Sequence, residues 1–130
     1  MAHNRLLRAL ELALQLMKGI NVNCAGQDFC KLILSGLKTV ETRRGKSLHP
    51  YTGRRVGLVR TGCGPAVLVG FATIGAPFQY TRRAWRAGRH HHQVKPGGPF
   101  DGGQWGYPLL NVKPCAPKLI KSRGRVAREI

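Results

Sequence analysis

The chain has 130 residues, with 22 Lys and Arg against 5 Asp and Glu, which gives a formal net charge of +17 at pH 7. This length favours a single domain, and no apolar run approaches the roughly 20 residues that a membrane-spanning helix needs. The 17 Gly and 8 Pro favour turns and short strands over a helical bundle. Such an excess of basic residues is typical of a domain that binds a polyanion, most often nucleic acid and otherwise an anionic membrane surface.

The first expected element is an amphipathic helix over residues 4–18, for which Asn4 is the N-cap. We expect this helix to pack on the domain, although its basic amphipathic character also fits an organelle-targeting or membrane-surface helix. A secretory signal peptide is excluded because Glu11 and Gln15 interrupt the apolar stretch. The sequence therefore predicts a helical extension over residues 1–19 and a cytoplasmic protein, with targeting by this helix as the alternative.

The next segment predicts a short extended piece, a helix and a strand. Residues 20–23 are extended, and Asp28 can cap a helix whose apolar residues recur on one face. Gly36 supplies the left-handed position that ends this helix. Residues 39–43 then alternate in the way that a strand does.

The middle of the chain predicts a β-hairpin and a short helix. Residues 55–61 and 66–74 are β-branched segments on either side of a turn that contains Gly and Pro. A short helix is expected after Thr81. The run His90–His92 is not predicted to be a metal site, because three adjacent side chains cannot all face one ion within regular structure. A solvated basic loop from Arg89 to His92 is expected instead.

The last third of the chain predicts a loop and two more strands. Residues 93–104 hold several Gly and Pro and are expected to be a loop. Residues 105–112 and 115–120 are strand candidates, and their prolines, Pro108 and Pro114, restrict them to the edges or ends of strands.

The domain organisation follows from these elements. One domain is expected over residues 20–120, followed by a basic tail over residues 121–130 that frays. The four cysteines form no zinc-binding spacing, so they are expected to be free thiols in a reducing compartment, and no metal or other cofactor is predicted. These cysteines are Cys24, Cys30, Cys63 and Cys115.

The segment with the most chemical information follows the predicted helix. Within six residues it places Lys38, Glu41 and Arg43, so one carboxylate lies between two cations in a chain with very few acids. On the surface such a group is a salt bridge worth about 0–1 kcal/mol. If buried, the lysine and glutamate could act as a general base and its orienting partner.

These residues resemble the signature of the ASCH domain family, which has the pattern G-x-K-x-x-E-x-R after a short helix. The pattern falls on Gly36, Lys38, Glu41 and Arg43. Residues 53–59 and 67–74 are similar to the second and third barrel strands of the family, and residues 105–112 are similar to its closing aromatic segment. The resemblance covers roughly residues 20–120.

The resemblance implies an α+β, mainly β fold, namely a small PUA-like β-barrel with flanking helices and a cleft lined by the signature residues. Family members are associated with RNA binding, and some are enzymes that hydrolyse N4-acylated cytidines or cleave RNA. In the amidohydrolases this motif supplies a lysine base and a threonine nucleophile. Lys38 matches the lysine, whereas Glu41 stands in the place of the threonine.

The sequence therefore predicts a protein that binds RNA or a nucleotide in a basic cleft. An amidohydrolase or ribonuclease with Lys38 and Glu41 as catalytic residues is the first alternative, and a membrane-surface or partner-binding protein is the second. Arginines around Trp85 combine phosphate contacts with a surface on which bases can stack, although Trp85 can equally be a core residue. The predicted ligand-binding residues are Lys38, Glu41, Arg43, Arg44, Arg82, Arg83, Trp85 and Arg86.

Overall fold

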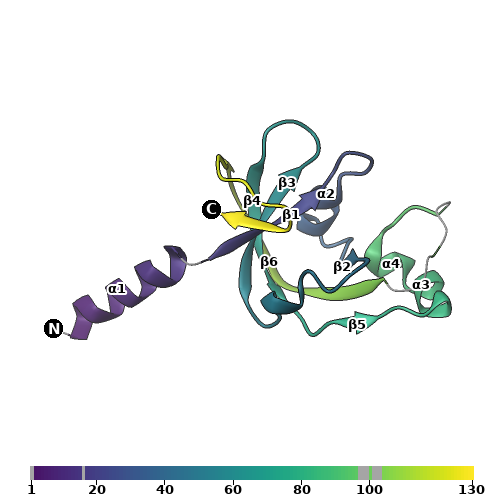
Figure 1. Cartoon of the computed structure of the whole chain (residues 1–130), viewed down its shortest axis with the longest axis horizontal. Helices are drawn as coiled ribbons and strands as arrows, with labels where there is room; N and C mark the ends of the chain where they lie inside the picture. The colour runs from purple at the N-terminus through teal and green to yellow at the C-terminus, as the bar shows by residue number, and fades with distance from the viewer. Residues whose placement is uncertain (1, 16, 97–99, 101–103) are drawn as a thin grey trace.

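A computed structural model describes the whole chain except residues 1, 16, 97–99 and 101–103 (Figure 1). Within the described residues, seven strands form one curled mixed sheet in the order β2-β6-β4-β3-β1-β7, with β5 paired to β6. The strands are β1 (Lys18–Asn23), β2 (Val40–Arg43), β3 (Arg55–Thr61), β4 (Val67–Ile74), β5 (Phe78–Gln79), β6 (Trp105–Leu119) and β7 (Ala127–Glu129).

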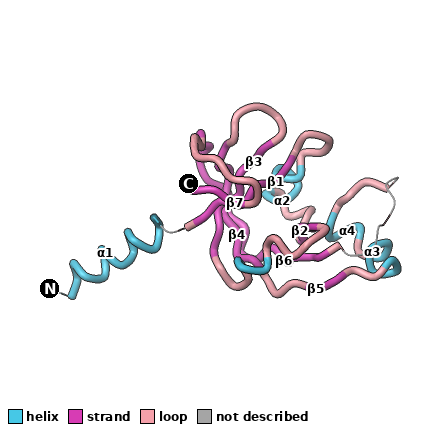
Figure 2. Tube along the Cα trace, in the orientation of Figure 1, coloured by secondary structure: helices cyan, strands magenta, loops and turns pink. Residues whose placement is uncertain are grey.

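Short helices flank this sheet (Figure 2). They are α2 (Phe29–Leu34), the 3-10 helix η1 (His49–Tyr51), α3 (Arg82–Ala87) and α4 (Arg89–His92), while a longer helix, α1 (Ala2–Gln15), precedes β1. The core lies inside the curl of the sheet and includes Ile20, Val22, Ile33, Leu58, Ile74 and Tyr107. The predicted α+β, mainly β class is confirmed.

Local sequence signals explain how α2 leads into β2. The Lys31 backbone N–H donates to Asp28 Oδ1 at 3.1 Å, which caps the helix as predicted. Gly36 has a φ of +82°, the left-handed conformation that ends a helix without a Cβ penalty. This turn directs the chain into β2, which pairs with β6.

The predicted hairpin is also present, but the two strands predicted after it are one. β6 is continuous from residue 105 to 119, and it lies between β2 and β4. The expectation that Pro108 and Pro114 mark edges or ends of strands is therefore wrong. The pairing of β6 with β4 changes register twice, and Pro114 lies opposite Gly70 at one of these irregularities. A proline can lie inside a sheet at such a bulge because regular pairing is already interrupted there.

The C-terminal tail was predicted to fray, but part of it forms a strand. β7 pairs antiparallel with β1, and Lys18 lies opposite Glu129. Side-chain packing supports this pairing, since the end of the chain covers two strand glycines. A Cβ added at Gly19 or Gly57 would lie 2.5 or 2.7 Å from a side-chain atom of Ile130. The two glycines therefore make the space in which Ile130 packs.

The prediction of a loop at His90–His92 is also wrong. These residues belong to α4, and the ring of His92 is fully buried. It stacks on Trp85 with ring centroids 4.0 Å apart and planes 16° apart. His92 Nδ1 accepts from the Val94 backbone N–H at 3.0 Å, while its Nε2 lies 2.9 Å from the Trp85 carbonyl oxygen. The buried imidazole, with a hydrogen bond at each ring nitrogen, therefore connects the end of α4 to α3 and to the loop that follows.

The N-terminal helix α1 stands apart from the sheet (Figure 1). Residues 2–9 are all exposed, including Leu6 and Leu7. The expectation that this helix packs on the domain is therefore wrong. None of the helices in the described part of the chain is long and apolar enough to cross a lipid bilayer.

Deleting residues 1–15 is expected to leave the domain folded, because the exposed part of α1 supports no core contact and β1 begins only at Lys18. The midpoint of thermal unfolding, followed by circular dichroism, should stay within about 2 °C of the full-length value. A clearly lower midpoint would show that α1 does pack on the domain.

Candidate functional site

The signature residues lie at the start of β2, between α2 and the aromatic strand β6. Pairing of β2 with β6 sets Glu41 opposite Tyr107 and Arg43 opposite Trp105. The turn before β2 is fastened to both flanking helical segments. Lys38 N–H donates to the Leu32 carbonyl oxygen of α2 at 3.0 Å, and Thr39 N–H donates to the His91 carbonyl oxygen of α4 at 2.9 Å.

Lys38 is buried, with 1 % of its surface exposed. Its Nζ donates to the His92 carbonyl oxygen at 2.6 Å and lies 3.6 Å from Glu41 Oε1. The same ammonium lies 4.6 Å from the centre of the Phe29 ring. Burial lowers the pKa of Lys38 below its ordinary value, and the Glu41 carboxylate opposes this shift.

Glu41 connects the two cations of the motif. Its Oε1 accepts from the Thr42 backbone N–H at 2.9 Å, and its Oε2 lies 3.6 Å from Arg43 Nη2. Arg43 Nη2 also donates to the Asn21 carbonyl oxygen of β1 at 2.6 Å. Lys38, Glu41 and Arg43, here called the signature cluster, therefore form a largely buried group and not a surface salt bridge.

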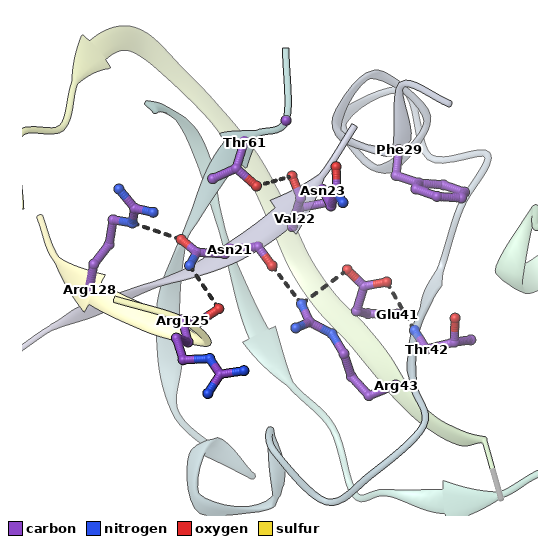
Figure 3. A pocket seen from close by; sticks show the side chains of 11 residues that line it. Asn21, Val22, Asn23, Phe29, Glu41, Thr42, Arg43, Thr61, Arg125 and Arg128 are labelled. Atoms are coloured by element: carbon purple, nitrogen blue, oxygen red, sulfur yellow. Dashed lines mark hydrogen bonds and ion pairs between the residues drawn. The ribbon is translucent and has the colours of Figure 1, made fainter. Parts of the chain in front are cut away.

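A pocket of about 450 Å³ opens beside the signature cluster (Figure 3). Glu41, Thr42 and Arg43 line it from β2. The remaining walls include six residues that the sequence did not single out as ligand-binding: Asn21, Asn23, Phe29, Thr61, Arg125 and Arg128.

Two further pockets adjoin the first. A pocket of about 230 Å³ shares Thr42 and Arg43 with it, and one of about 660 Å³ shares Asn23 and Phe29. These two are themselves joined through common lining residues, namely Arg44, Val94 and Lys95. The three neighbouring pockets around the end of β2 are here together called the cleft.

The structure brings only part of the predicted set to this cleft. Arg43, Arg44 and Trp85 line it, together with Glu41. Trp85 is half-buried and has one face stacked on His92, so it combines packing with a place in the cleft wall. Three predicted arginines of α3 are exposed and line none of the three pockets: Arg82, Arg83 and Arg86.

The prediction missed the C-terminal arginines because the tail was expected to fray. Val126 and Ile130 were the available signal, since both pack against buried clusters and sit on either side of Arg128. Phe29 was not predicted as a site residue either, yet it lines the cleft and its ring contacts Lys38. The described residues bring no three His, Cys, Asp or Glu side chains together as a metal site would require.

Comparison of the whole structure with solved structures decides the fold family. It superposes on a crystal structure of a ZmASCH point variant from Zymomonas mobilis with a TM-score of 0.64 and 23 % identity, covering 80 % of this chain and 76 % of that chain. The chain has the ASCH fold. The structure of ASCH from Zymomonas mobilis gives a TM-score of 0.62 at 23 % identity, covering 79 % of this chain and 73 % of that one.

A second ZmASCH variant gives a TM-score of 0.63 at 21 % identity, covering 81 % of this chain and 75 % of that one. No protein-family model and no curated protein matches this sequence. The ASCH resemblance predicted from the signature is therefore confirmed by the three-dimensional fold.

The buried ammonium predicts a specific pH dependence of stability. Between the lowered folded-state pKa of Lys38 and its ordinary pKa of 10.5, the unfolded chain binds more protons than the folded one. Through this window the free energy of unfolding of the wild type should rise with pH relative to that of Lys38→Met, by at most about 1.4 kcal/mol per pH unit. Lowering the pH through the same window should reverse this gain.

Urea unfolding of both proteins between about pH 7.5 and 9.5 measures this difference. Other titrating groups are common to both proteins and cancel to first order. A difference in the free energy of unfolding that stays constant with pH would contradict the assignment of Lys38 as a group destabilised by burial.

Proposed function

We propose that this ASCH-fold protein binds RNA, or a nucleotide of RNA, in the cleft beside the signature cluster. The observation that carries the proposal is the charge of the cleft walls. Basic side chains line it from β2 and the residue after it, from α4 and the loop after it, and from the C-terminal segment. They are Arg43, Arg44, Arg89, Lys95, Arg125 and Arg128. Glu41 is the one carboxylate among the described lining residues, and Lys38 and Arg43 flank it.

Aromatic and polar groups in the same cleft support a nucleic-acid ligand over a simple anion. Phe29 and Trp85 contribute ring surface to its walls, and bases stack on such rings without strong sequence preference. Glu41 can accept a hydrogen bond from the amino group of a base edge. The mixture of cations, rings and one acceptor matches the groups that single-stranded RNA presents.

Binding of RNA should weaken steeply as the salt concentration is raised. Each cleft residue that contacts a phosphate should contribute to the slope of log K against log salt. Lys95 is exposed and lines two of the three pockets. If it contacts a phosphate, Lys95→Met should weaken binding of a fluorescein-labelled single-stranded RNA of mixed sequence. It should also reduce the slope of log K against log salt by about 0.7.

Fluorescence anisotropy between about 50 and 200 mM KCl measures both quantities. Lys118→Met is the matched control, because Lys118 is an exposed lysine of β6 that lines none of the three pockets. Equal effects of the two substitutions, or wild-type affinity that ignores salt, would contradict binding in the cleft.

A hydrolase is the second candidate, and the buried pair of Lys38 and Glu41 is the observation that favours it. A lysine with a lowered pKa beside a carboxylate is a familiar general-base arrangement. The threonine nucleophile of the related amidohydrolases is nevertheless replaced by Glu41. We therefore favour binding without turnover.

The purified wild type is expected to leave both N4-acetylcytidine and single-stranded RNA intact under conditions in which it binds RNA. Chromatography of the nucleosides and gel analysis of the RNA measure turnover. Hydrolysis by the wild type that is lost in Lys38→Met/Glu41→Gln would establish an enzyme. This double variant is suitable because it removes the charges of both partners and leaves neither one buried alone.

A further inference from the structure

The C-terminal segment forms one wall of the 450 Å³ pocket, and a single residue of β1 fastens it there (Figure 3). Asn21 Nδ2 donates to the carbonyl oxygens of Gly124 and Arg125 at 2.8 and 3.1 Å. Asn21 Oδ1 accepts from Arg128 Nε at 2.8 Å. Because its own carbonyl oxygen accepts from Arg43, Asn21 brings the C-terminal arginines and the signature cluster to the same pocket.

The guanidinium groups of this wall keep donors available for a ligand. Arg128 uses its Nε for Asn21 and its Nη1 for the Ser122 carbonyl oxygen at 2.9 Å, out of five N–H donors. Arg125 is exposed, and its side chain makes no hydrogen bond or ion pair with the described residues. The Glu41 carboxylate on the same pocket is already shared between Lys38 and Arg43. Glu129 of the same segment pairs with Lys18 and does not line the pocket. Apart from Glu41, the described residues that line this pocket include no carboxylate to neutralise Arg125 and Arg128.

We propose that Arg125 and Arg128, together with Arg43, form a phosphate subsite, so that the pocket takes a phosphorylated nucleotide unit and not an uncharged nucleoside. The inference rests on the proposed function and specifies its ligand. Guanidinium groups bind phosphate oxygens through paired, charge-assisted hydrogen bonds. An uncharged nucleoside has no phosphate and therefore no negative charge to pair with these three arginines.

The shape of the pocket gives the nucleotide an orientation. Its volume of about 450 Å³ lies within the range of roughly 300–1,000 Å³ typical of small-ligand sites. Figure 3 places Arg125 and Arg128 on the side away from Phe29, with Glu41 and Arg43 between them. The phosphate then lies at the C-terminal wall, and the base extends toward the Phe29 ring, within reach of the Glu41 carboxylate.

The test compares two neighbouring arginines of the same segment. Arg125→Met removes a guanidinium that lines the pocket, whereas Arg123→Met removes an exposed one that does not. The probes are the four ribonucleosides and their 5′-monophosphates, measured by calorimetry, and a labelled RNA oligonucleotide, measured by anisotropy. Thermal unfolding of both variants checks that the fold is retained.

The wild type is expected to bind the monophosphates more tightly than the nucleosides. Arg125→Met should weaken monophosphate and RNA binding about tenfold, and Arg123→Met should change it by less than about twofold. Tight mononucleotide binding would identify a free nucleotide as the ligand, and binding only to the oligonucleotide would identify a nucleotide within a strand.

Two outcomes would overturn the subsite. If RNA binds but the two variants behave alike, the subsite is wrong and the proposed function stands. If neither RNA nor any monophosphate binds the wild type, both are wrong. Monophosphate binding that depends on Arg125 without RNA binding would retain the subsite and overturn RNA as the ligand.

Discussion

The burial of the Lys38 ammonium is the constraint on which the arrangement of the cleft depends. Removing a charged group from water costs several kcal/mol unless polar partners replace the lost hydration. Here the partners come from three separate elements: the Glu41 carboxylate of β2, the His92 carbonyl of α4 and the Phe29 ring of α2. All three elements must therefore be in place together, and the cleft that they border is correspondingly well defined.

The aromatic group behind α4 serves this constraint indirectly. Burial lowers the pKa of His92, and its ring accepts from the Val94 N–H, so the imidazole is neutral with its proton on Nε2. That proton is donated to the Trp85 carbonyl oxygen, and the two rings stack. The carbonyl that receives the Lys38 ammonium is thereby held in position by groups that do not touch a ligand themselves.

Local signals in the sequence were sufficient for much of the fold. Asp28 and Gly36 marked both ends of α2 because capping and left-handed turns depend on a few adjacent residues. The signature motif likewise located three residues that the fold brings into one buried group. The burial of His92 could not be predicted from the sequence, because it depends on contacts with Trp85, seven residues earlier. The basic, polar residues around His92 give no local sign of this packing.

The cleft wall was missed for a related reason. β7 has three residues and too little hydrophobic pattern to be recognised alone, and it becomes a strand only because β1 offers a free edge. Arg128 in this strand and Arg125 before it therefore looked like part of a solvated tail. Pro114 of β6 was misjudged in the same way, since the bulge that accommodates it is a property of the paired strands and not of the single one.

The fastening of β7 by Asn21 has a consequence for synthesis of the protein. The hydrogen bonds of Asn21 to Arg125 and Arg128 join residues 104 and 107 positions apart. Contacts at such separation form late, and during translation they must wait until residues 124–128 have left the ribosome. A nascent chain can build the hairpin and cap α2 well before that point. Until then the cleft lacks its C-terminal wall, so this pocket is completed only at a late stage of folding.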